Sequence, residues 1–136
     1  MSFQLHFGIR HKYPSLATGI TLDATLSRGP KRIECQAKVD TGAQCCLFER
    51  EIGEHLDLNI ESGLRMEMGT LAGSLVAFGH EITLVTLGLT FETVGYFAES
   101  YDMQRNILGW QGWLQLVRLA IIDYDEELYL SPYSQA

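Results

Sequence analysis

The residues best suited to chemistry in this sequence are the consecutive Asp40, Thr41 and Gly42. Apolar and polar residues alternate over positions 33–39, which predicts a strand that ends directly before Asp40. An acid at the junction of a strand and a tight loop is held rigidly and stays accessible, as acid or base catalysis requires. The alternative is a loop acid that caps a nearby backbone N–H group, and the tripeptide alone leaves both interpretations open.

The other potentially reactive side chains form weaker patterns. Three cysteines, Cys35, Cys45 and Cys46, without C-x-x-C spacing argue against a disulfide framework and against a zinc knuckle. We interpret the neighbouring pair as small packing groups, with a redox or vicinal-disulfide site as the alternative. The histidines lack the i,i+4 spacing of a zinc-binding helix, so we expect no metal site. Trp110 and Trp113 are interpreted as core or interface aromatics.

Alternating strands are expected to position Asp40, because period-two patterns cover most of the chain. A hairpin turn is predicted at Gly29-Pro30, one short helix within 49–58, and a second helical turn within 106–114. The pattern thus predicts a single mostly-β domain over residues 1–136, with one or two short helices. The predicted strands cover 3–9, 20–26, 33–39, a segment from 64 to about 68, 75–87, 89–97, 117–123 and 127–131.

Composition narrows the function classes. The chain has 136 residues, 15.3 kDa and 46% hydrophobic residues, enough for one domain to fill a core without disulfides or a metal. A net charge of -7 repels phosphate backbones, so nucleic-acid binding is not expected. No stretch approaches the roughly 18 apolar residues of a membrane span. We therefore expect a soluble, cytoplasmic protein, with free thiols in a reducing compartment.

The context of Asp40 supports a more specific hypothesis. The segment 37–49, AKVDTGAQCCLFE, resembles the active-site loop of the retropepsin-like aspartic proteases. The segment 106–109, Asn-Ile-Leu-Gly, is similar to the second marker of that family, and 66–75 falls where the family has a flap, a hairpin that closes over substrate. The resemblance covers roughly residues 18–131. It implies an all-β acid-protease fold, a closed or partly open β-barrel with a flap hairpin and one or two short helices.

The resemblance also implies a reaction. In that family two carboxylates share one proton around a water molecule that attacks the peptide bond, and no metal or organic cofactor takes part. This chain has one Asp-Thr-Gly, so the second carboxylate is expected from Asp40 of another copy in a twofold-symmetric homodimer. The leading hypothesis is an aspartic endopeptidase acting on extended polypeptides. The alternative is a catalytically inactive peptide-binding or dimerisation module of the same fold.

The same resemblance implies roles for individual residues. Thr41 matches the residue whose hydroxyl braces the two active-site loops across the dimer axis, Gly42 the one that lets substrate backbone approach, and Ala43 a small residue beside the cleft. A terminal strand over 128–130 is expected at the subunit interface. Gln44-Cys45 and Trp110 replace the charged residues of retroviral members, so a different mode of dimer locking is expected. The expected flap tip comprises Gly69, Thr70, Leu71, Ala72 and Gly73, and the second motif comprises Ile107, Leu108 and Gly109.

Overall fold

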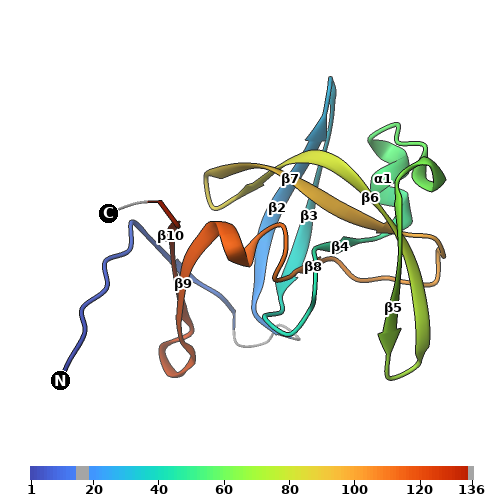
Figure 1. Cartoon of the computed structure of the whole chain (residues 1–136). Helices are drawn as coiled ribbons and strands as arrows, with labels where there is room; N and C mark the ends of the chain where they lie inside the picture. The colour runs from blue at the N-terminus through green and yellow to red at the C-terminus, as the bar shows by residue number, and fades with distance from the viewer. Residues whose placement is uncertain (15–18, 135–136) are drawn as a thin grey trace.

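The computed structural model describes residues 1–14 and 19–134, and most of them lie in strands (Figure 1). The predicted all-β class is confirmed. The strands are β1 (Ile9–Lys12), β2 (Thr21–Arg28), β3 (Lys31–Val39), β4 (Leu47–Phe48), β5 (Leu64–Thr70), β6 (Gly73–Thr86), β7 (Leu89–Ala98), β8 (Ile107–Leu108), β9 (Val117–Ile122) and β10 (Glu127–Pro132). The helices are α1 (Arg50–His55) and the short 3-10 helices η1 (Ile60–Ser62), η2 (Leu114–Leu116) and η3 (Asp123–Asp125).

A ring-like sheet forms the body of the molecule. Seven strands follow the order β2-β3-β8-β4-β7-β6-β5, and an additional pairing of β2 with β6 closes the sheet on itself. The closure is possible because β6 is 14 residues long. Residues 73–79 of β6 pair with β5, and residues 77–86 pair with β7. The last four residues of β6, 83–86, also pair with β2. The β5–β6 hairpin therefore projects from the ring, as Figure 1 shows.

A second sheet joins the two ends of the chain in the order β1-β10-β9. The strand predicted over 3–9 is wrong in its extent, because β1 begins only at Ile9 and the side chains of Phe3 and Leu5 are exposed. Alternation alone cannot make a strand where no partner strand supplies hydrogen bonds. The strand over 128–130 is the middle one of this sheet, and Leu128 and Leu130 are fully buried within the single chain.

The segment 106–114 also differs from its prediction. It begins with the two-residue strand β8 and continues through turns, and only Leu114 starts the 3-10 helix η2. The hydrogen-bonding groups of β8 are taken up by β3 on one side and β4 on the other. These pairings with distant strands override the helical tendency of the local sequence.

The core lies inside the ring and under α1. Its largest fully buried side chains include Trp113, Phe48 and Phe97. The indole N–H of Trp113 donates to the hydroxyl of Thr86 at 3.0 Å, so both buried polar groups are partnered. Within residues 1–14 and 19–134, no helix is long and apolar enough to cross a membrane.

Candidate active site

Asp40 lies where β3 leaves the ring. The last two residues of β3 pair in parallel with β8, Lys38 opposite Ile107 and Val39 opposite Leu108. The backbone N–H of Asp40 then donates to the carbonyl oxygen of Leu108 at 3.0 Å. The residue that follows the strand is therefore fixed by a neighbour almost seventy positions away in the sequence.

The loop after β3 folds back on the Asp40 carboxylate. The N–H of Gly42 donates to Asp40 Oδ1 at 3.0 Å, and the N–H of Ala43 donates to the Asp40 carbonyl at 3.1 Å. Asp40 is half-buried, whereas Thr41 and Gly42 are exposed. Within the described part of the chain, Asp40 Oδ2 has no hydrogen-bond partner. The carboxylate thus combines the capping contact of a structural loop acid with one free oxygen.

Gly109 holds the second motif against this loop. A Cβ atom at position 109 would lie 2.1 Å from the carbonyl oxygen of Cys45 and 2.9 Å from that of Ala43, so no larger residue fits without a backbone shift. The next two residues continue the contact, because the N–H of Trp110 donates to Ala43 at 2.8 Å and that of Gln111 to Gln44 at 2.9 Å. The structure therefore brings the predicted loop and second motif together.

The predicted flap is a hairpin whose tip is exposed. Thr70 pairs with Gly73 at the end of the ladder, and Leu71 and Ala72 form the turn between them. The hydroxyl of Thr70 donates to the Gly73 carbonyl at 2.7 Å and accepts the N–H of Ala72 at 3.2 Å. Gly73 has a φ of +122°, which a side chain rarely permits. Gly69, at the start of this turn region, is exposed as well.

Apolar side chains connect the β5–β6 hairpin to the loop that follows Asp40. The thiol of Cys45 lies 3.8 Å from the sulfur of Met68, and both belong to a small cluster separate from the main core. Thioethers adapt their shape readily, so this contact does not require a rigid partner. The cluster contains Cys45, Leu47, Ala77 and Tyr96, with Met66, Met68, Leu75, Met103 and Ile107 packed against it.

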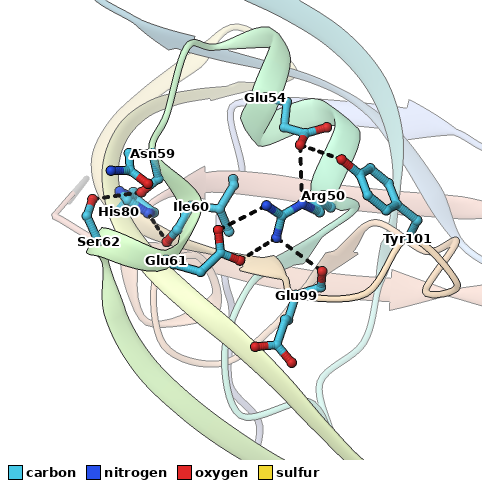
Figure 2. A network of polar contacts seen from close by, with 9 residues as sticks. All are labelled: Arg50, Glu54, Asn59, Ile60, Glu61, Ser62, His80, Glu99 and Tyr101. Atoms are coloured by element: carbon cyan, nitrogen blue, oxygen red, sulfur yellow. Dashed lines mark hydrogen bonds and ion pairs between the residues drawn. The ribbon is translucent and has the colours of Figure 1, made fainter.

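A polar network fixes the segment that leads into the hairpin. Figure 2 shows the guanidinium of Arg50 between Glu54, Glu61 and Glu99. The guanidinium donates to the carboxylate of Glu61 at 2.9 Å, to that of Glu54 at 3.2 Å and to the backbone carbonyl of Glu99 at 3.1 Å. The ring of Tyr101 lies 5.4 Å from the guanidinium carbon. The hydrogen bond from Arg50 holds the pKa of Glu61 below its ordinary value. Since Glu61 is in η1 just before β5, the network anchors the base of the hairpin to α1.

The cysteines are poor nucleophiles in this structure. Burial raises the pKa of Cys45 to about 11 and that of Cys46 to about 12. Thiolates, which are the reactive form, are therefore scarce near neutral pH. This agrees with the interpretation of the pair as packing groups. Among the described residues, no group of three or more histidine, cysteine or acidic side chains could hold a metal ion.

A pocket opens directly beside Asp40, and sequence reasoning missed two of its residues. Lys38 and Arg105 both line it, on β3 and just before β8. A signal for Lys38 was present, because it lies only two residues before Asp40 in the sequence. No comparable signal placed Arg105. The pocket is lined by Thr21, Gln36, Lys38, Asp40, Arg105, Asn106 and Ile107.

Comparisons with known proteins support the fold. The structure is similar to a retropepsin-like aspartic protease from Rickettsia conorii, with a TM-score of 0.62 and 19% identity over 82% of this chain and 88% of that one. It is also similar to EIAV protease complexed with the inhibitor HBY-793, with a TM-score of 0.52 and 20% identity over 71% of this chain and 86% of that one. No family model matches the sequence, and no curated protein matches it. The chain therefore has the retropepsin-like fold, as its sequence predicts.

Proposed function

We propose that this protein is an aspartic endopeptidase whose active site forms between two copies of the chain, with Asp40 of each copy supplying one carboxylate. The observation that carries the proposal is the setting of Asp40. Its backbone is fixed by Leu108, one carboxylate oxygen is free, and a pocket opens beside it. Rigid placement with an accessible oxygen is the requirement for a general base.

Two copies of the chain are needed because the reaction uses two carboxyl groups and the pocket of one chain supplies one. Peptide hydrolysis by this chemistry requires one ionised and one protonated carboxyl group, because like charges a few ångströms apart do not both ionise. Asp40 is the only acid among the described residues that line its pocket. Asp123, by contrast, lies in η3 between β9 and β10, and its carboxylate accepts a hydrogen bond from the hydroxyl of Tyr13. A twofold axis beside Asp40 supplies the missing group without any further residue type.

The mechanism then uses the parts described above. The ionised Asp40 takes a proton from water, and the water oxygen attacks the peptide carbonyl. The protonated Asp40 of the other copy stabilises the developing oxyanion with a hydrogen bond while keeping its proton, and it transfers that proton to the leaving nitrogen as the C–N bond breaks. The β5–β6 hairpin, with its exposed tip at 69–73, would cover an extended substrate and pair with its main chain. Thr41 would brace the two loops across the axis, and Gly42 and Ala43 would leave space for the substrate backbone.

The proposal treats residues 1–136 as one domain that acts on protein or peptide substrates without a cofactor. Among the described residues all three cysteines are free thiols, which suits a reducing compartment, and we propose the cytoplasm. Two copies carry a combined charge of 2 × (-7) = -14, so their association should strengthen with added salt, which screens the repulsion. Sedimentation at low and high salt measures this directly.

The test compares wild type, Asp40→Asn and the matched control Asp102→Asn on a diverse peptide pool across about pH 4–7, the range open to a shared-proton dyad. Asp102 is exposed and lies outside the pocket, so its isosteric change should leave cleavage intact. Asp40→Asn should abolish cleavage. Equal cleavage by all three proteins, or no cleavage by a wild type shown to be dimeric, would refute the proposal in favour of an inactive binding module.

Mixing the proteins tests the shared site. If each active site needs both carboxylates, adding an equal amount of Asp40→Asn should lower the activity per wild-type chain to about half once subunits have exchanged. Adding the control Asp102→Asn, which is itself expected to cleave, should leave the activity per total chain unchanged. An activity per wild-type chain that is insensitive to Asp40→Asn would show that one chain suffices.

A further inference from the structure

The pocket beside Asp40 is bordered by two cations. Lys38 lies near the end of β3, two residues before Asp40, and both residues line the pocket. Arg105 reaches the pocket from the other side, from the residues just before β8. Since β8 pairs in parallel with the end of β3, the fold places these two cations at one site although they are far apart in the sequence.

Neither cation is satisfied within the described part of the chain. Lys38 and Arg105 make no ion pair there, and their side chains donate no hydrogen bond, even though the chain holds 17 acidic residues. Most other basic side chains behave differently. Ion pairs within 4.0 Å are formed by Arg10, Lys31, Arg32, Arg50 and Arg65.

Two acids outside the pocket accept hydrogen bonds from residues of its wall. Gln36, on the pocket wall, donates its amide N–H to Asp23 at 2.8 Å. Asn106, also on the wall, donates its amide N–H to Glu49 at 3.4 Å. Among the described residues, neither carboxylate forms an ion pair with Lys38 or Arg105. The residues that line the pocket itself include two cations and one acid, Asp40.

The backbone next to the pocket accommodates the lysine. A Cβ atom at Gly19 would lie 2.5 Å from Cε and 3.2 Å from Nζ of Lys38. The end of the lysine side chain thus lies against the backbone of Gly19, which has room for it only because that residue is glycine. Lys38 also pairs with Thr21 between β3 and β2, and both residues line the pocket.

We infer that this pocket binds a carboxylate side chain of the substrate, so that the enzyme prefers polypeptides with Glu or Asp adjacent to the cleaved bond. The inference rests on the proposed function, because it names the substrate class for the same site. A guanidinium and an ammonium group both donate to a carboxylate with charge-assisted hydrogen bonds. An apolar side chain in the same place would cover two cations and leave them without water or partner, which is unfavourable.

The test uses matched peptides that differ only in carrying Glu, Gln or Leu at the positions on either side of the cleaved bond. Wild type should cleave the best Glu peptide with a kcat/KM about tenfold above its Gln counterpart, the size of one charged hydrogen bond. The double variant Lys38→Gln/Arg105→Gln should cleave the two peptides equally. The control Lys12→Gln removes one exposed charge outside the pocket and should retain the wild-type preference.

Reversing the charges of both pocket cations should reverse the substrate preference. Lys38→Glu/Arg105→Glu should favour a peptide with Lys at the same position over its Gln counterpart. Both residues are exposed, so these substitutions should leave the unfolding midpoint in urea close to that of wild type, which is measured in parallel. A wild type that cleaves the Leu peptide as well as the Glu peptide, or a double Gln variant that keeps the Glu preference, would overturn the inference.

Binding separates this inference from the proposed function. Fluorescence anisotropy with labelled Glu and Gln peptides is measured on Asp40→Asn with and without the Lys38 and Arg105 changes. Selective binding of the Glu peptide that depends on both cations, without any cleavage by wild type, would support the pocket and refute the peptidase. Cleavage without any Glu preference would leave the peptidase standing and refute the pocket.

Discussion

The close approach of Gly109 to the loop that follows Asp40 leads to a quantitative prediction for the variant Gly109→Ala. In Gly109→Ala the new Cβ would lie 2.1 Å from the carbonyl oxygen of Cys45, and ordinary contact begins at 3.4 Å. The two backbones must therefore separate by about 1.3 Å, the difference between these distances. Such a shift breaks or stretches the bonds from Trp110 to Ala43 at 2.8 Å and from Gln111 to Gln44 at 2.9 Å.

The expected magnitude combines two effects. Overpacking a rigid site costs about 1–3 kcal/mol, and each lost backbone hydrogen bond costs about 1 kcal/mol. We expect Gly109→Ala to lower the free energy of unfolding by about 3–5 kcal/mol, a large part of the stability of a typical domain. Because the displaced loop carries Asp40, the proposed cleavage of peptides should fall even at temperatures where the variant is still folded.

Urea unfolding at one fixed protein concentration measures the loss, since the stability of an associating chain depends on concentration. The matched control is Gly69→Ala, where a Cβ would meet nothing within 4 Å. That variant should stay within about 0.5 kcal/mol of wild type. If Gly109→Ala unfolds within about 1 kcal/mol of wild type and cleaves at the wild-type rate, the close approach does not hold the active-site loop in place.

Three further outcomes follow from the structure. The hydrogen bond that lowers the pKa of Glu61 stabilises the fold above the unfolded glutamate pKa and is lost as the pH falls, so the stability gap between wild type and Arg50→Met should narrow below about pH 4. A gap in urea unfolding that is constant from pH 3 to 7 would contradict this. Trp113→Phe leaves the buried hydroxyl of Thr86 without its partner and should cost about 1–3 kcal/mol in the same assay, whereas a change under about 0.5 kcal/mol would show that the bond is dispensable. Cys45, with its pKa raised to about 11 by burial, should react with a thiol reagent at pH 8 at least about 100-fold more slowly in the native protein than in urea, and equal rates would refute its burial.

Local sequence patterns predicted most individual elements. The alternation over 33–39 and the turn at Gly29-Pro30 correspond to β3 and the β2–β3 hairpin, and the short amphipathic stretch after Phe48 corresponds to α1. These predictions hold because period and turn chemistry act within a few residues. The strand over 3–9 failed for the opposite reason, since Phe3 and Leu5 alternate correctly but have no neighbouring strand to pair with.

The sequence by itself determined that one acid, Asp40, follows a strand and enters a glycine-containing loop, because those features depend only on residues next to one another. Only the tertiary structure decided what surrounds that acid. Gly109 meets Cys45, and Arg105 joins Lys38 beside Asp40, through the parallel pairing of β3 with β8. The two-residue alternation of apolar and polar residues predicts which side chains of a strand share a face. It does not predict which distant strand will pair with that strand. That choice comes from closing the ring around a common core, and it gives the acid its neighbours.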